Sequence, residues 1–246
     1  LIIAIVAAEL GKAVSKETKV DILVTPLVTI FAGVGLSMLI AAPIGAAASQ
    51  VGTLIMWATE QAPLVMGILV SVIVGVALTL PISSAAICAA LGLTGLAGGA
   101  AVAGCCAQMV GFAVMSYKEN GVGGLVSQGL GTSMLQMGNI IKNPRIWIAP
   151  TLASAITGPL ATCLFHFEMN GAAVSSGMGT CGLVGQIGVY TGWVNDIAAG
   201  TKAAITPMDW AAMLLICFVL PAVLSVVFCE IERKLGWIKE GDLKLN

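Results

Sequence analysis

The chain has 246 residues, of which 58% are hydrophobic and 9% are charged, and its mean hydropathy is +1.01. Soluble domains carry roughly 25% charged residues, so this composition excludes an ordinary soluble domain and predicts an all-α polytopic membrane protein in contact with the lipid bilayer. The formal net charge is −1, and the basic residues form no stripe with interleaved aromatic residues, so nucleic acid is not an expected partner.

The N-terminal stretch contains one complete predicted span. Residues 1–10 have the composition of the end of an earlier span, and the chain begins inside this apolar run without a methionine or a basic n-region. This start predicts further helices before Leu1 in the functional protein rather than a signal peptide. After a polar connection at 11–21, residues 22–42 are long enough to cross about 30 Å of hydrocarbon. Residues 43–61 are semi-polar and predict an interfacial or partly inserted helix.

A predicted span and a glycine-broken hairpin follow. Residues 62–80 are strongly apolar and predict a span. In residues 81–99, Pro81 cannot donate a backbone hydrogen bond, and glycines at positions 92, 95, 98 and 99 interrupt the helical pattern. This pattern predicts a re-entrant hairpin, whose irregular backbone is tolerated within the bilayer only where protein or a wet cavity surrounds it. Residues 100–116 predict the next span.

The second half of the chain has a similar order of segments. Residues 121–143 are semi-polar, and residues 146–165 predict a span. Residues 171–188 (GAAVSSGMGTCGLVGQIG) contain six glycines and no charge. They predict a second re-entrant hairpin, of the kind at which transporters bind substrate. A polar loop at 191–207 leads to the last predicted span, at 210–229.

Two short patterns occur in both halves. SQVGT at 49–53 resembles SQGLGT at 127–132, and the paired serines, cysteine and glycine of the first hairpin loosely resemble those of the second. The resulting hypothesis is a single transmembrane domain, 1–246, that contains two diverged repeats, at 43–116 and 121–229. Chance resemblance is the alternative, because small residues are common in all membrane helices.

The basic residues predict an orientation. If each hairpin enters and leaves on one side, seven basic residues share one side of the membrane: Lys118, Lys142, Arg145, Arg233, Lys234, Lys239 and Lys244. The other four share the opposite side: Lys12, Lys16, Lys19 and Lys202. Because cytoplasmic loops carry an excess of lysine and arginine, the larger set and the charged tail at 230–246 are predicted to be cytoplasmic.

The sequence contains no recognisable catalytic or metal-binding motif. Seven cysteines occur without a CxxC pair, and there is one histidine. The cysteines are therefore predicted to pack as small apolar residues, with a metal or redox site as the less favoured alternative. No nucleophile–base–acid set and no phosphate loop occurs. We predict that the chain is not an enzyme and uses no cofactor.

The first candidate binding residues are the hydroxyls of the two hairpins: Ser83, Ser84, Ser175 and Ser176. At glycine-rich tips such hydroxyls can exchange hydrogen bonds with a polar solute, because glycine lets backbone groups approach it. In the alternative, which the residue types favour, these serines bond back to their own helix backbone or pack against neighbouring helices.

Five further polar residues are candidates for the same solute site: Gln128, Asn139, His166, Asn170 and Gln186. For Gln128 and Asn139, which lie in the semi-polar segment, a wetted interfacial face is the alternative. His166 and Glu168 are two residues apart, so they would not share a helix face, and a solvated helix end is the favoured alternative. The five tryptophans lie near predicted span ends, which predicts an interfacial belt.

Three stretches resemble a known family. They are 61–96 (QAPLVMGILVSVIVGVALTLPISSAAICAALGLTGL), 137–150 (MGNIIKNPRIWIAP) and 173–188 (AVSSGMGTCGLVGQIG). Together they resemble the membrane EIIC-like subunit of the bacterial phosphotransferase system, in particular the branch often called perfringolysin regulator-like, or PfoR-like. The resemblance covers most of the chain from Gln61 onward and lies in the order of segments more than in any single motif.

The resemblance implies a homodimeric sugar permease in the inner membrane of a bacterium, with separate phosphotransferase IIA and IIB proteins as partners. This chain shows neither a soluble domain nor a phosphocysteine loop, and His166 and Glu168 do not match the histidine and glutamate motif of better-known sugar EIIC proteins. Coupling to phosphorylation is therefore left open.

Three functions are consistent with these observations. The first is a permease that moves a small polar solute, a carbohydrate, by alternating access. The second is a membrane-embedded sensor or regulator that binds a solute without moving it. The third is an ion-coupled carrier of a non-sugar solute, which predicts that Glu60, Glu168 or His166 faces a cavity rather than the membrane interface.

Overall fold

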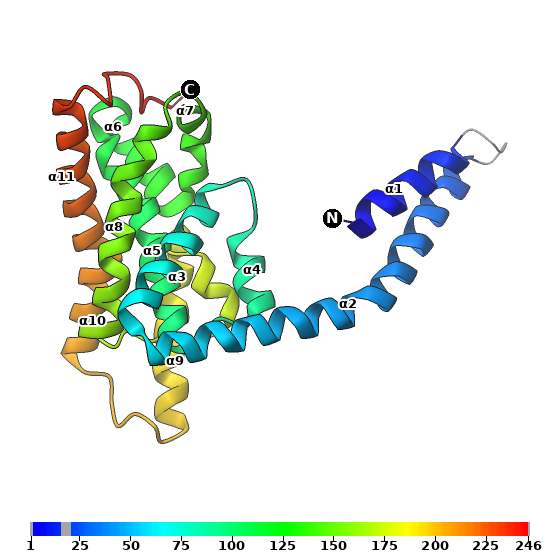
Figure 1. Cartoon of the computed structure of the whole chain (residues 1–246), viewed down its shortest axis with the longest axis horizontal. Helices are drawn as coiled ribbons and strands as arrows, with labels where there is room; N and C mark the ends of the chain where they lie inside the picture. The colour runs from blue at the N-terminus through cyan, green and yellow to red at the C-terminus, as the bar shows by residue number, and fades with distance from the viewer. Residues whose placement is uncertain (1, 16–20, 246) are drawn as a thin grey trace. The chain divides into compact units, whose positions relative to one another are not determined.

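The structure, a computed structural model, describes residues 2–15 and 21–245 (Figure 1). The chain forms two compact units, Leu1–Gln50 and Val51–Asn246, and each is described by itself. All regular secondary structure of the described residues is helical, apart from one isolated β-bridge. The predicted all-α membrane helix bundle is therefore confirmed.

The first unit contains α1 (Ile2–Val14) and the first part of α2 (Asp21–Gln61). α1 extends past the predicted start of the polar connection, of which residues 16–20 lie outside the described part of the chain. α2 continues through Pro43, so the segments expected at 22–42 and 43–61 are one helix. A proline removes one helical hydrogen bond, but in apolar surroundings unpaired backbone groups are costly, and the remaining bonds favour a continuous helix.

The core of the second unit is a bundle of helices around α5 (Gly95–Met115). Its three neighbours are α3 (Pro63–Thr79), α8 (Ile148–Pro159) and α11 (Leu220–Lys234). α5 is the most enclosed of these helices, since 17 of its 21 residues are buried. Its central place explains a sequence that is apolar on every side.

Short turns lengthen two of these helices. The turns η3 (Pro144–Trp147) and η4 (Leu160–Leu164) continue α8, and α10 (Pro207–Leu214) and η7 (Leu215–Val219) precede α11 without a break. The resulting helices Pro144–Leu164 and Pro207–Lys234, together with α5, are long and apolar enough to cross a membrane. α3 is a shorter apolar helix.

Small residues explain how closely these helices pack. A side chain at Gly104 of α5 would overlap the backbone of Ser71 in α3, and one at Gly158 of α8 would meet the carbonyl of Gly67 in α3. In a bilayer, helices associate through such close contacts, because lipid is as apolar as leucine and exerts little hydrophobic pressure between them. The glycines of α3, α5 and α8 at positions 67, 75, 104 and 158 therefore mark close helix contacts.

The remaining elements of the second unit are short. They are α4 (Ser84–Leu91), α6 (Tyr117–Val126), η1 (Ser127–Gly131), η2 (Ser133–Gln136), α7 (Met137–Lys142), η5 (Ala173–Gly177), η6 (Cys181–Leu183) and α9 (Val184–Ala198). α9 is longer than the sequence suggested, and its last turns occupy the first part of the loop expected at 191–207.

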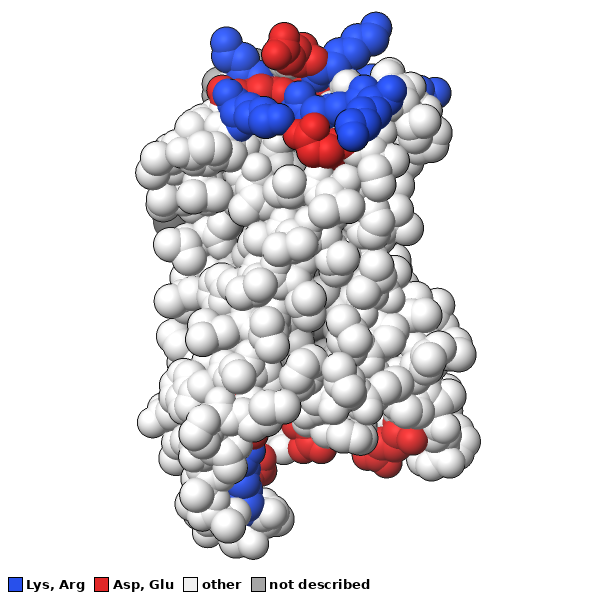
Figure 2. Space-filling view, turned by 90° about the vertical axis from the view of Figure 1, so that its left-hand side faces the viewer, with Lys and Arg blue, Asp and Glu red and all other residues white. Residues whose placement is uncertain are grey.

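The charges of the second unit gather at two ends, with an uncharged face between them (Figure 2). We call one the basic end; it carries the seven basic residues that were predicted to share a side, and ion pairs such as Lys118–Glu230 (2.7 Å) and Arg233–Glu119 (2.9 Å). We call the other the acidic end: Glu60, Glu168, Asp196, Lys202 and Asp209. The predicted grouping is confirmed within this unit. Lys12 belongs to the first unit, and Lys16 and Lys19 lie outside the described residues.

Candidate functional site

The first glycine-broken segment, 81–99, is a short helix, a turn and the start of α5. Ser83 caps α4, because its Oγ accepts a hydrogen bond of 3.2 Å from the backbone N–H of Ala86. Gly92 then ends α4 with a left-handed φ of +65°, which a glycine adopts without strain. The backbone therefore changes direction immediately before the long central helix.

The second glycine-broken segment, 171–188, is built from the turns η5 and η6 and the first part of α9, and it packs directly on the first. Ser84 donates a hydrogen bond of 2.7 Å to the carbonyl of Gly177. In return, Ser176 donates a bond of 2.7 Å to the carbonyl of Leu93. Two irregular backbone segments thus satisfy each other's carbonyls through buried hydroxyls.

These contacts give the predicted serines a structural task. Ser84, Ser175 and Ser176 are buried, and the two bonds to carbonyls match the alternative in which hydroxyls satisfy backbone groups, although here the carbonyls belong to the other segment. A cavity of about 430 Å³ lies beside the contact, and its lining includes Ser83, Ser84, Met178 and Cys181. Solute binding by these serines stays a prediction.

A different arrangement follows the end of the α8 helix at Leu164. Residues 165–170 are not helical, and their side chains alternate: Phe167 and Met169 are buried, while His166 and Glu168 are exposed. Met169 forms an antiparallel β-bridge with Gly95, with backbone bonds of 3.0 Å in both directions. In extended backbone, residues two apart lie on the same side.

His166 and Glu168 lie just beyond the end of this helix, and both are exposed. Both residues line one pocket, together with Phe165 and Phe167. Gly99 of α5 permits the course of residues 165–170, since any side chain there would overlap the carbonyl oxygen of Phe167. His166 itself has a φ of +43°, an uncommon value for a residue with a side chain, and such strain is often found at functional sites.

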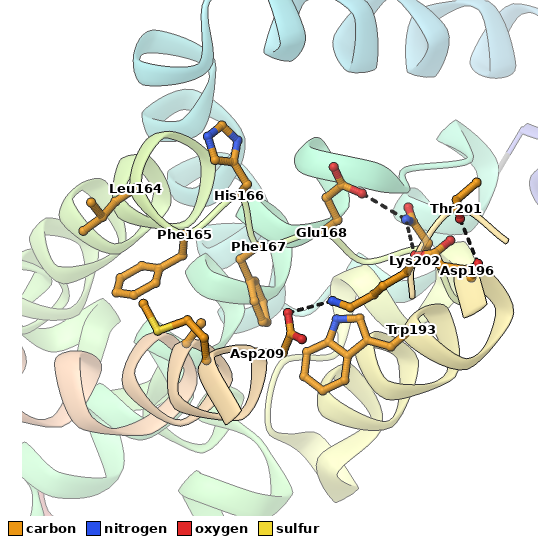
Figure 3. A pocket seen from close by; sticks show the side chains of 13 residues that line it. Leu164, Phe165, His166, Phe167, Glu168, Trp193, Asp196, Thr201, Lys202 and Asp209 are labelled. Atoms are coloured by element: carbon orange, nitrogen blue, oxygen red, sulfur yellow. Dashed lines mark hydrogen bonds and ion pairs between the residues drawn. The ribbon is translucent and has the colours of Figure 1, made fainter. Parts of the chain in front are cut away.

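We call this pocket the acidic pocket. It has a volume of about 580 Å³ and lies at the acidic end, between the extended segment, α9, α10 and the loop that joins them (Figure 3). Its polar lining residues are His166, Glu168, Asn170, Trp193, Asp196, Thr201, Lys202 and Asp209. The volume and the number of convergent polar groups fit a binding site for a small polar molecule.

Two carboxylates of the pocket share one amide. The Nδ2 of Asn170 donates to Glu168 Oε2 at 3.0 Å and to Asp196 Oδ2 at 2.9 Å. An ionised carboxylate accepts several hydrogen bonds, so each keeps acceptor capacity for hydroxyl groups of a solute. Asn170 therefore holds two acceptors from distant parts of the chain at one point.

A cation lies on the other side of the pocket. Lys202 Nζ forms an ion pair of 2.7 Å with Asp209 and lies 5.4 Å from the ring centre of Trp193 (Figure 3). Asp209 is positioned by a capping box at the start of α10, in which the hydroxyl of Thr206 accepts from the Asp209 N–H and the carboxylate accepts from the Thr206 N–H. The lysine is thus fixed between a rigid helix start and an aromatic face.

The remaining candidates lie elsewhere. Gln128 and Asn139 are at the basic end, in a hydrogen-bonded cluster that includes the C-terminal segment. Gln186 is buried, and its Nε2 lies 3.2 Å from Cys106 Sγ. Of the nine predicted binding residues, the structure brings His166 and Asn170 together in the acidic pocket and leaves the other seven outside its lining.

Sequence reasoning missed three charged residues of the pocket: Asp196, Lys202 and Asp209. A signal existed, since these are the three charged residues between Glu168 and Glu230. Asp196 and Lys202 lie within the polar loop expected at 191–207, but Asp196 belongs to α9, which extends to Ala198, and Asp209 belongs to α10. Trp193, expected in an interfacial belt, is buried under Lys202 and packs edge-on against Trp210 at 5.5 Å.

The fold and the pocket define an integral membrane protein whose helices enclose a polar site near one end. Residues 1–245 match the family model for the phosphotransferase system EIIC. The chain belongs to this family and is a permease-type membrane component of that system, as its sequence resemblance predicted. No curated protein and no solved structure matches the chain, and its place in the PfoR-like branch stays a prediction.

Proposed function

We propose that the chain is a permease that moves a small polar solute, a carbohydrate, across the membrane by alternating access. The observation that carries this proposal is the acidic pocket, where the acceptors of Glu168 and Asp196 converge on Asn170 at one end of a membrane helix bundle. Sugar hydroxyls are hydrogen-bond donors, and charge-assisted bonds to carboxylates are stronger than neutral ones. Family membership supports the same class of function.

The proposal includes a setting for the protein. The basic end faces the cytoplasm of a bacterium, in accordance with the excess of lysine and arginine there, and the acidic pocket receives solute from the other side. The chain acts as a homodimer with separate IIA and IIB proteins. The two glycine-broken segments are re-entrant hairpins, supported by their irregular backbone and mutual hydrogen bonds.

The test is uptake of radiolabelled pentoses and hexoses into proteoliposomes that contain the purified full-length protein. Glu168→Gln keeps the size of the side chain and removes its charge, and we expect it to raise the KM of the transported sugar by about tenfold, since a hydrogen bond to a charged group contributes about 1.5–3 kcal/mol. Glu60→Gln is the matched control, because this exposed carboxylate does not line the pocket. Equal KM values in the two variants would contradict a solute role for the acidic pocket.

A second candidate function is ion-coupled transport of a non-sugar solute. The observation in its favour is that Glu168 and His166 line a cavity, as this hypothesis predicted. Ion-coupled transport requires that uptake of a charged or amphoteric solute depend on an imposed proton or sodium gradient. A sugar permease needs no such gradient. Binding of a sugar without uptake under any gradient would instead support a membrane sensor.

A further inference from the structure

The segment after α11 does not extend into solvent but packs onto the basic end. Ile238 and Leu243 are buried, with exposed fractions of 3% and 0%. They join a core cluster that also contains Phe112 of α5 and Cys229 of α11. The tail expected at 230–246 is therefore partly the last turns of α11 and partly a segment that is bound by the bundle.

Side chains of the bundle hold the backbone of this segment, in addition to its own turn hydrogen bonds. The N–H of Leu243 donates to Glu119 Oε2 at 2.9 Å. Asn120 makes a paired contact, in which its Nδ2 donates to the carbonyl of Leu243 and its Oδ1 accepts from the N–H of Leu245, both at 2.8 Å. One asparagine side chain thus pairs with the segment as a neighbouring strand would.

Two more side-chain amides, from η2 and α7, also bind this segment. Gln136 Nε2 and Asn139 Nδ2 donate to the carbonyls of Leu243 and Lys244, each at 3.0 Å. Both amides belong to a buried chain of hydrogen bonds, since Asn139 also donates to Gln136 and Gln136 donates to Gln128, each at 2.8 Å. The site therefore contacts backbone groups and one buried leucine, which is how proteins commonly bind an extended peptide.

A seam of buried polar side chains runs from this contact toward α5: Asn139, Gln136, Ser133, Thr79 and Gln108. Ser133 lies on the same short turn as Gln136, and its Oγ is 2.9 Å from Thr79 Oγ1. Thr79 in turn bonds to Gln108 of α5 at 3.3 Å. Buried polar groups therefore continue from the basic end to Gln108, which is fully enclosed in the central helix.

Glycines flank the outer part of the segment. Gly236 and Gly241 have left-handed φ values of +72° and +93°, and between them Lys239 and Glu240 are exposed while Ile238 is buried. Glycine at these positions permits the reversal that returns the chain to the bundle and allows other backbone conformations at little cost.

We propose that Glu119, Asn120, Gln136 and Asn139 form a peptide-binding site that holds residues 243–245 of the same chain as a releasable latch. The latch closes the basic end of the seam that runs from Asn139 to Gln108. Its release exposes amides that can exchange hydrogen bonds with a polar solute, so the latch controls access from this end. The inference goes beyond the proposed function, and its first test does not depend on transport.

The experiment uses the native cysteines as reporters of release. Cys229 packs in the same cluster as Leu243, whereas Cys105 is fully buried in another cluster. The full-length protein in detergent is treated with a water-soluble maleimide, and labelling at each cysteine is followed by mass spectrometry. We expect Cys229 to react about tenfold faster than Cys105 in the unaltered protein, since local opening needs less free energy than global unfolding.

Two test substitutions and one control sharpen the experiment. Leu243→Ala removes the buried anchor and is expected to speed labelling at Cys229 by at least about tenfold, with Cys105 unchanged. Leu245→Ala is the matched control, because this half-buried leucine contributes only its backbone N–H to the described contacts, and it should leave both rates unchanged. Asn120→Leu removes the paired contact at similar size and should also speed labelling at Cys229.

Two outcomes overturn the latch. One is an unchanged Cys229 rate in both Leu243→Ala and Asn120→Leu. The other is a parallel rise at Cys105, which would make the segment a permanent part of the core. Sugar uptake is then measured on the same variants: faster uptake by Leu243→Ala supports gating. Uptake by no variant, together with selective opening at Cys229, would sustain the latch and reject the proposed permease.

Discussion

The two ends of the second unit use the same kinds of polar side chain in opposite ways. At the acidic end, Asn170 holds the carboxylates of Glu168 and Asp196 around a pocket of about 580 Å³. At the basic end, Asn139 donates a hydrogen bond to Gln136, and both amides donate to carbonyls of the chain's own C-terminal segment. The same residue types thus line an accessible site at one end and a self-filled site at the other.

The difference has a backbone cause. The acidic pocket exists because the non-helical residues 165–170 line one cavity together with residues of α9, α10 and the loop between them. The site at the basic end is filled because the chain returns after Gly236 and inserts Leu243. Polar composition in a membrane bundle therefore identifies regions in which a solute can bind, and the course of the neighbouring backbone decides which region is accessible.

The largest expected effect comes from removing both carboxylates of the acidic pocket. The combination of Glu168→Gln and Asp196→Asn should weaken sugar affinity by about 100-fold, because two charge-assisted acceptors of about 1.5 kcal/mol each are lost. Isothermal titration with the transported sugar measures the loss. Glu230→Gln with Glu240→Gln, at the basic end, is the matched control and should leave the affinity unchanged. Similar losses in both double variants would remove the functional distinction between the ends.

A change at Gly99 should be the next largest. Gly99→Ala places a methyl group on the carbonyl of Phe167 and should destabilise the protein by about 1–3 kcal/mol, because the extended segment must move away from α5. Thermal unfolding in detergent measures this effect. Gly123→Ala is the control, since a side chain there meets no described atom within 4 Å and φ is not positive. A stable Gly99→Ala variant with unaltered sugar binding would show that the pocket does not need this contact.

The ion pair of the acidic pocket should have a moderate effect. Lys202 and Asp209 have side chains that are 27% and 22% exposed, and Lys202 also contacts the ring of Trp193. Lys202→Ala should therefore lower the free energy of unfolding by about 1–2 kcal/mol, as the sum of a partly screened ion pair and a cation–π contact. Chemical denaturation followed by tryptophan fluorescence measures it. No change in stability would mean that solvent screens this pair fully.

The ion pair at the basic end should have the smallest effect. Lys118 and Glu230 are at the same distance of 2.7 Å, but their side chains are 70% and 45% exposed. Lys118→Ala should leave the free energy of unfolding almost unchanged, because exposed pairs are screened by water and salt. The same denaturation experiment at low and high salt checks this. If Lys118→Ala lost more unfolding free energy than Lys202→Ala, the predicted order of the two ion pairs would be wrong.

Several features could be predicted from the sequence because they depend on local composition. Runs of apolar residues predicted the spans that the structure has at α5, 144–164 and 207–234, and the distribution of lysine and arginine predicted the basic end. The irregular backbone around Ser84 and Ser176 followed from dense glycine. Burial in lipid and the conformational freedom of glycine act residue by residue, so the pattern of one stretch is sufficient.

Contacts between distant stretches decided the sites. Glu168, Asp196 and Asp209 form one pocket only because an extended segment, α9 and α10 meet there, and no spacing in the chain encodes that meeting. Gln128 and Asn139 belong to the cluster that binds residues 243–245, more than one hundred positions from Asn139. Whether a polar side chain serves a solute, the backbone or another side chain depends on which partner packing brings within hydrogen-bond distance, and that choice belongs to the tertiary structure.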